Sequence, residues 1–181
     1  AARNPAPVLT FDATLTGVQV GPLLKDAGVY DKYSGTGNVG LKLTSQGTAL
    51  REIKQGLNGS ASVVLRDGKI EGVNLQKLIQ NARAAYDVAR GKPVPATPAA
   101  ADETVFRELR ANWRIADGVA RNDDLLLQGS ALRASGQGTA HLINETLDYR
   151  LKVTLVEQPG GKETMVPVIV SGSFAKPEYS V

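Results

Sequence analysis

The sequence contains no cysteine and a single histidine, His141. The absence of cysteine excludes disulfide bonds, thiolate zinc sites, iron–sulfur clusters and cysteine nucleophiles. One histidine cannot build a multi-histidine metal site, and it leaves one candidate for a histidine general base. We therefore expect no metal ion and no other cofactor.

Aromatic residues and charge of one sign are also scarce. Aromatics make up 5% of the 181 residues, and the formal net charge is +3. Nucleic-acid binding needs a concentrated basic stripe, often with stacking rings between the charges, so we expect no nucleic-acid partner. No apolar run approaches the roughly 20 residues of a membrane-spanning helix. Because Met165 is the only methionine, we expect a fragment of a longer chain, whose absent parts make any membrane contact.

Strict alternation of apolar and polar residues is the strongest pattern in the sequence. It runs through residues 9–16, 38–44, 105–115 and 147–155. Successive side chains of a strand point to opposite faces, so each segment has one apolar and one polar side. A parallel sheet covered by helices shows near-continuous apolar runs instead. The pattern predicts a mainly β (α+β) fold, built on a twisted, mostly antiparallel sheet of hairpins with one apolar concave face.

Two Asp-Gly dipeptides, Asp67-Gly68 and Asp117-Gly118, lie between apolar segments. Asp-Gly supplies the two positive φ angles of a type I′ turn, so both dipeptides predict a tight hairpin. Residues 144–146 and 159–161 resemble further chain reversals. The two predicted hairpins would place Leu65 opposite Ile70 and Ile115 opposite Ala120.

One segment follows a helical period instead. Apolar residues recur at helical spacing between Asn74, a favourable N-cap, and Gly91, which is followed by Pro93. This predicts one long amphipathic helix, about 74–90, packed on the sheet. Shorter helical turns are expected at residues 22–27 and 49–57. The Pro/Ala-rich segment at about 92–102 is expected to be a mobile loop inside a single domain, 1–181.

No motif predicts catalysis. The glycines at residues 35–40 and 136–138 precede strands rather than the helix of a phosphate-binding loop, so they are expected where a strand bends or is closely approached. Asp123 and Asp124 would point to opposite faces of a strand, and with Asn122 they favour a turn or a strand start. A hydrolase would need a serine, His141 and an acid to converge, whereas the alternation favours a polar-face His141. The sequence therefore predicts a protein that is not an enzyme.

A series of segments follows one order along the chain: residues 34–43, 57–75, 104–125, 136–138, 145–151 and 166–177. Taken together, these segments resemble the C-terminal region of the AsmA family, which includes TamB-like members. The chain departs from the family pattern at residues 129–132, where a Ser-Pro is expected before the apolar pair. The resemblance implies a periplasmic domain of a protein tethered to the bacterial inner membrane by an N-terminal helix. It also implies a role in outer-membrane assembly and lipid homeostasis through a β-groove that carries phospholipid.

Three alternatives remain for the apolar face. It can shelter acyl chains, because each CH₂ removed from water contributes about 0.8 kcal/mol. Leu75, Ile79 and Tyr86 of the helix can instead fill it and make an ordinary core. The domain can also be a structural module that binds outer-membrane assembly factors by strand addition at an exposed edge. The expected partners are thus phospholipid or an envelope protein. The candidate lipid-groove residues are Val39, Leu41, Leu43, Leu109, Trp113, Ile115, Leu147, Tyr149, Leu151 and Val153.

Overall fold

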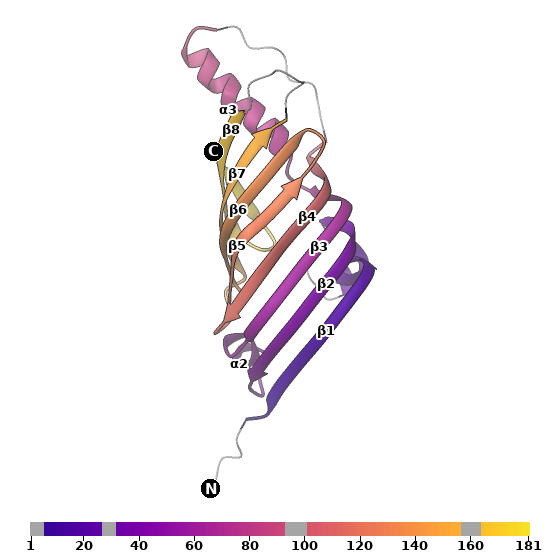
Figure 1. Cartoon of the computed structure of the whole chain (residues 1–181). Coiled ribbons are helices and arrows are strands. Elements are labelled where there is room, and N and C mark those ends of the chain that lie inside the picture. Colours follow the sequence, from indigo (N-terminus) through magenta and orange to yellow (C-terminus); the bar gives the residue numbers. More distant parts are fainter. Residues whose placement is uncertain (1–5, 27–31, 93–100, 157–163) are drawn as a thin grey trace.

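The computed structural model describes residues 6–26, 32–92, 101–156 and 164–181. In this part of the chain, nine strands form one open sheet in which every neighbouring pair is antiparallel and the spatial order equals the sequence order (Figure 1). The mainly β fold and the antiparallel pairing predicted from the alternation are confirmed. The strands are β1 (Val8–Gln19), β2 (Tyr33–Gln46), β3 (Asn58–Glu71), β4 (Glu103–Ala116), β5 (Val119–Gln128), β6 (Leu132–His141), β7 (Thr146–Leu155), β8 (Thr164–Ser173) and β9 (Pro177–Ser180).

Three helices occur in the described residues: α1 (Val20–Asp26), α2 (Leu50–Gln55) and α3 (Leu75–Ala89). The two short helical turns are therefore present, although α1 begins two residues earlier than predicted and residue 27 lies outside the described part. The α3 helix has the predicted N-cap, because the Asn74 side chain accepts a hydrogen bond from the backbone N–H of Lys77 at 2.8 Å. Residues 93–100, most of the predicted loop, lie outside the described residues.

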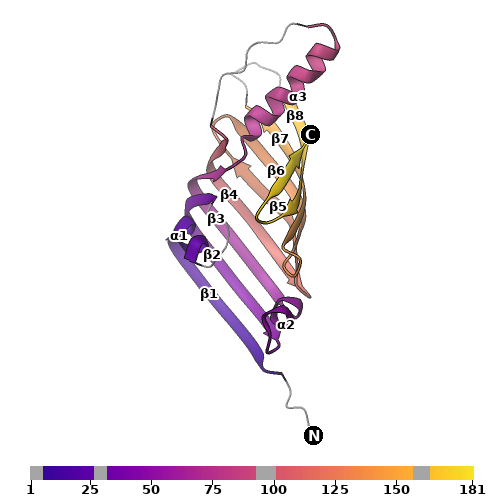
Figure 2. The ribbon, with the colours of Figure 1, turned by 180° about the vertical axis from the view of Figure 1, so that it is seen from behind.

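The α3 helix is not packed along the sheet as predicted. Leu75 and Ile79 in its first two turns are buried, but Tyr86 and Val88 near its end are 57% and 62% exposed. The helix crosses the end of the sheet and continues beyond the strands (Figure 2). Its start is attached to β4, where Thr104 Oγ1 accepts from Leu75 N–H and donates to the carbonyl of Val73. Because the attachment lies at the end of the strand, the second half of α3 has no sheet beneath it.

Only one of the two predicted Asp-Gly hairpins forms. Asp117 and Gly118 have φ angles of 49° and 73°, as a type I′ turn requires, and Ile115 lies opposite Ala120 as expected. Asp67 also has a φ of 49°, but Gly68 is not in the positive-φ region and β3 continues to Glu71.

The Asp67-Gly68 step is a β-bulge within β3. The register between β2 and β3 shifts there, so Ile70 lies opposite Tyr33 and Leu65 opposite Gly37, and the predicted Leu65–Ile70 pair is wrong. A bulge changes which residues face the core. On the neighbouring strand β4, Phe106 is therefore 2% exposed, whereas Val105 in the predicted alternation is 60% exposed.

A second bulge lies at Asp123 and Asp124 in β5. The register of β5 shifts between Asn122 and Leu125, so the aspartates lie inside a strand and not in the predicted turn or strand start. The predicted reversal at residues 144–146 is confirmed, because β6 and β7 are joined there and Glu145 has a φ of 54°. The predicted reversal at residues 159–161 lies outside the described residues.

The apolar face is concave. Trp113 on β4 donates a hydrogen bond from Nε1 to the hydroxyl of Tyr149 on β7 at 2.7 Å. In a flat sheet, strands three places apart are separated by about 14 Å, so the two side chains meet because the sheet curls toward this face. The residue opposite Tyr149 is Gly138, where a Cβ would overlap the tyrosine ring. This confirms the expectation that these glycines mark a close approach.

Candidate functional site

All ten candidate groove residues lie on the concave face. Residues directly opposite in register share a face. One row runs from Leu43 through Ile115 to Leu147, and the next row includes Leu41 and Trp113. The remaining candidates belong to the same face by register or by alternation along their strands. They are Val39, Leu109, Tyr149, Leu151 and Val153.

One end of this face is a filled core. Val153 is fully buried, Tyr149 is 7% exposed, and both belong to one cluster with Leu75 and Ile79 of α3. Four further candidates are partly buried and pack against that cluster. They are Val39, Leu109, Leu147 and Leu151. The first half of α3 therefore fills the face here, which was the ordinary-core alternative.

The other end of the face is open. Phe11 and Leu9 on β1 are 54% and 43% exposed, and Leu41, Leu43 and Ile115 are half-buried outside the core cluster. We call this region the open strip. Its residues are Leu9, Phe11, Ala13, Leu15, Leu41, Leu43, Trp113 and Ile115.

Small residues run along the middle of the open strip. On β3, Gly59 lies between Leu43 and Ile115, and Ala61 lies between Leu41 and Trp113. Large apolar side chains on β2 and β4 therefore flank a line of minimal side chains on β3. An extended hydrocarbon chain laid along β3 would contact apolar atoms on both sides.

The Trp113–Tyr149 hydrogen bond lies between the core and the open strip. It satisfies the indole N–H and gives the hydroxyl a partner, so two polar tips are accommodated on an apolar surface. Burial raises the pKa of Tyr149, while the hydrogen bond from Trp113 acts in the opposite direction. Burial also raises the pKa of Tyr179 on β9 to about 12, with a smaller contribution from Tyr33 on β2.

The α2 helix is bonded to the end of β2, next to the open strip. Ser45, which is 6% exposed at the end of β2, donates a hydrogen bond from Oγ to the carbonyl of Ile53 at 2.6 Å. Lys54 forms an ion pair with Glu145 at 2.6 Å, which ties α2 to the β6–β7 turn. The Glu52 carboxylate accepts from the backbone N–H groups of Thr48 and Ala49, and these bonds lower its pKa.

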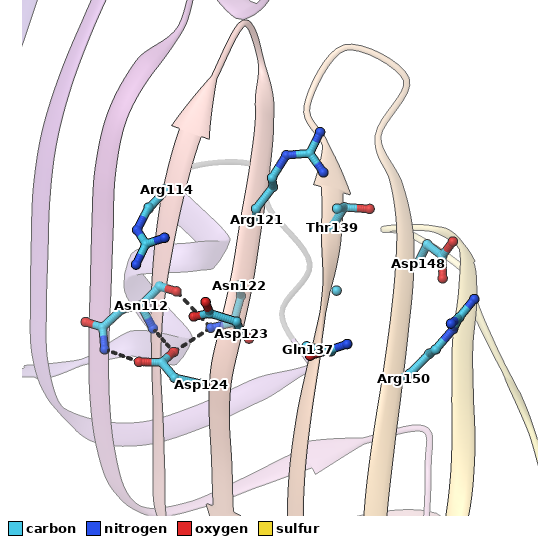
Figure 3. A pocket seen from close by; sticks show the side chains of 11 residues that line it. Asn112, Arg114, Arg121, Asn122, Asp123, Asp124, Gln137, Thr139, Asp148 and Arg150 are labelled. Atoms are coloured by element: carbon cyan, nitrogen blue, oxygen red, sulfur yellow. Dashed lines mark hydrogen bonds between the residues drawn. The ribbon is translucent and has the colours of Figure 1, made fainter.

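The opposite, polar face carries a hollow that the sequence interpretation missed. It has a volume of about 660 Å³ and lies over β4 to β7, where β5 bulges (Figure 3). The pattern offered one signal, because the polar sides of β4, β5 and β7 each contain at least one arginine. The residues that line this polar hollow are Asn112, Arg114, Arg121, Asn122, Asp123, Asp124, Gln137, Gly138, Thr139, Asp148 and Arg150.

Asp124 holds the bulge beside the hollow in place. Its carboxylate accepts from the backbone N–H and the Nδ2 of Asn112 at 2.8 and 2.6 Å, and from Nδ2 of Asn122 at 2.7 Å. The Asn112 bonds are the main reason that the pKa of Asp124 is lowered. Asp124 is thus an anion whose oxygens are already occupied, and Asp123 is not bonded in this way.

His141 ends β6 opposite Val119 and Thr146, and it makes no side-chain hydrogen bond with another residue that the structure describes. Within the same residues, no group of three or more His, Asp or Glu side chains is arranged to hold a metal ion. No described helix has the length and apolar character needed to cross a membrane.

Comparisons with known proteins give one consistent result. A family model described as the AsmA family matches residues 2–125. The protein AsmA of Escherichia coli (strain K12) is 26% identical over 184 aligned positions, which cover 97% of this chain and 29% of that protein. The chain thus spans less than a third of the length of this curated relative. The comparison with solved structures found no significant match.

Proposed function

The chain belongs to the AsmA family, whose members are bacterial envelope proteins, and we propose that it handles phospholipid without catalysis. In this proposal, the acyl chains lie on the open strip, and the domain belongs to a periplasmic segment of an inner-membrane-anchored protein with a role in outer-membrane assembly and lipid homeostasis. The membership supports the envelope role. The supporting structural observation is an apolar concave face that α3 covers at one end and leaves uncovered over β1 to β4.

The energetics favour a shared apolar surface over a set of specific contacts. Each CH₂ that moves from water onto the open strip contributes about 0.8 kcal/mol, so a stretch of six such groups contributes about 5 kcal/mol without any fixed headgroup contact. Gly59 and Ala61 provide room beside Leu43 and Ile115. The affinity of such a surface depends on the apolar area in contact with the lipid. The absence of fixed headgroup contacts suits a protein that must also release its lipid.

The test is to identify lipid that copurifies with the gently extracted protein by native mass spectrometry. Leu43→Lys places a charge on the open strip, and we expect it to abolish the copurifying phospholipid because a buried unpaired charge is costly. Thr44→Lys is the matched control, since it introduces the same side chain one position along β2 on the exposed polar face. Lipid-free wild-type protein, or equal lipid on both variants, would refute the proposal.

A second function is favoured by the edge strand β1. This strand has 12 residues, pairs with β2 on one side, and exposes Val8, Leu9 and Phe11. A long exposed edge is a template for another strand, so a structural role in binding envelope assembly factors is the alternative proposal. This alternative predicts that Thr14→Pro in β1 abolishes capture of an outer-membrane assembly factor. Glu178→Pro in β9 is the control and should leave capture unchanged. Equal capture by both variants would refute the alternative proposal.

A further inference from the structure

The concave face becomes progressively more covered along β3 and β4, from the open strip toward α3. On β3, Gly59 is exposed, Ala61 is half-buried and Leu65 is 6% exposed. On β4, Ile115 is half-buried, whereas Ala111, four residues closer to the start of the strand, is 1% exposed. These five residues lie on the concave face by register and alternation. The open strip therefore has an inner end, where the filled core begins.

Elements from both sides of the sheet meet around this core. Val20 of α1 belongs to the core cluster, and Tyr179 of β9 packs against the same cluster. In the strand order β9 lies seven places from β2, which in a flat sheet would correspond to about 34 Å. Tyr33 of β2 nevertheless contributes to the raised pKa of Tyr179, so the curl brings the two side chains near each other. The inner end of the open strip thus meets an enclosed core and not a continuing groove.

The inner end suits the apolar end of a ligand. Two polar tips lie there, the indole N–H of Trp113 and the hydroxyl of Tyr149, and they are bonded to each other at 2.7 Å. Among the described residues, no buried side-chain nitrogen or oxygen lacks a hydrogen-bond partner. A charged headgroup moved to this place would lose its water without gaining a partner, which is costly. The methyl end of an acyl chain has no such cost.

The line of small side chains sets how much of a chain is held. Gly59 and Ala61 are separated by about 7 Å along β3. An extended alkyl chain advances about 1.3 Å per carbon, because its C–C bonds are about 1.5 Å long, so roughly five or six carbons span this distance. Trp113 lies directly opposite Ala61, and Val63, the next residue of β3 on this face, packs against the core. The chain end would therefore stop beside Trp113.

We propose that the open strip recognises the methyl end of an acyl chain, which enters tail first and stops beside Trp113, Ala61 and Val63. This inference rests on the proposed lipid-handling function and specifies which part of the lipid is bound. The headgroup stays outside the strip, so the specificity is for an unbranched alkyl end. Free fatty acids and lysophospholipids share this chemistry. Trp113 and Ala61 are the residues that determine how deep the chain enters.

Fluorescence of Trp113, the only tryptophan, tests the orientation of the chain. Bromine quenches this fluorescence at close range, so the full chain is titrated with hexadecanoate brominated either at its terminal carbon or next to its carboxylate. We expect severalfold stronger quenching by the tail-brominated probe at equal occupancy, which calorimetric titration measures. Binding of both probes with equal quenching, or with stronger quenching by the head-brominated probe, would overturn tail-first entry but leave the proposed function standing. No binding of either probe would refute both.

Two leucine variants test the depth of the site. Ala61→Leu occupies the place beside Trp113 and should weaken binding of the tail-brominated probe at least about tenfold, because two or more CH₂ contacts, each contributing about fourfold, are lost. Ser60→Leu is the matched control, since it adds the same side chain at the neighbouring exposed position on the polar face. Unchanged binding in Ala61→Leu, with circular dichroism showing that both variants fold, would contradict the assigned stop.

Competition separates recognition of the tail from recognition of the headgroup. Unbrominated hexadecanoate and palmitoyl-lysophosphatidylcholine, both below their micelle concentrations, should relieve the quenching equally. Glycerophosphocholine has the same headgroup as the lysophospholipid but no acyl chain, so it should have no effect. Relief by glycerophosphocholine, or by only one of the two compounds with a tail, would overturn the proposal that the chain end is recognised.

Discussion

The two halves of α3 should differ sharply in their contribution to stability. Ile79 is fully buried in the core cluster, whereas Tyr86, two turns later, is 57% exposed. Removing a fully buried isoleucine side chain to alanine costs about 3–4 kcal/mol, from lost burial and the cavity that remains. Tyr86→Ala mainly loses its contact with Arg90, whose guanidinium lies 4.5 Å from the ring centre, and this costs about 1 kcal/mol at most.

The assay is thermal and urea unfolding of both variants, followed by circular dichroism. For a domain of this length each kcal/mol shifts the melting temperature by about 2–4 °C, so Ile79→Ala should lower it by about 10 °C and Tyr86→Ala by less than about 4 °C. Equal shifts would mean that the whole helix packs on the sheet. That result would refute the inference that the second half of α3 extends beyond it.

Three further predictions concern polar groups on the sheet. Tyr149→Phe should destabilise the fold by about 1 kcal/mol in urea unfolding and change the fluorescence of Trp113, the only tryptophan, because the indole N–H loses its acceptor. The pKa of Tyr179 is raised to about 12, so the stability it contributes is present below pH 10 and lost as the pH rises toward 12. Tyr179→Phe should flatten that alkaline loss, and an unchanged profile would contradict it. The pKa of Asp124 is lowered, so its contribution is present above its ordinary value of 3.8 and lost as the pH falls below it; Asp124→Asn should weaken that acid dependence.

The architecture follows from the alternation, but the positions of the bulges do not. Asp67 and Asp117 occupy the same left-handed backbone region, and both precede glycine. The second dipeptide turns the chain, while the first is held straight because Lys69 and Ile70 continue to pair with β2 and β4 on both sides. An Asp-Gly dipeptide in the sequence can predict that its aspartate adopts a positive φ. Whether the chain reverses there depends on partner strands that are distant in the sequence.

The sites show the same division between local and distant information. Alternation placed Leu43, Trp113 and Ile115 on one face, and the register confirms that they share it. It could not show which part of that face α3 covers, since the helical period continues through Tyr86, beyond the end of the sheet. The hollow also depends on distant pairing, because the position of Arg114 opposite Arg121 follows from the β4–β5 register and not from the local sequence.

The sequential strand order has a consequence for how such a molecule can change in size. Each described strand pairs with the one before it and the one after it in the chain. A hairpin can therefore be inserted or deleted without changing how the other strands pair. Every such event would widen or narrow the apolar face, measured across the strands, by two strand spacings, about 10 Å. The width of the sheet in a protein of this kind can thus change during evolution in fixed increments.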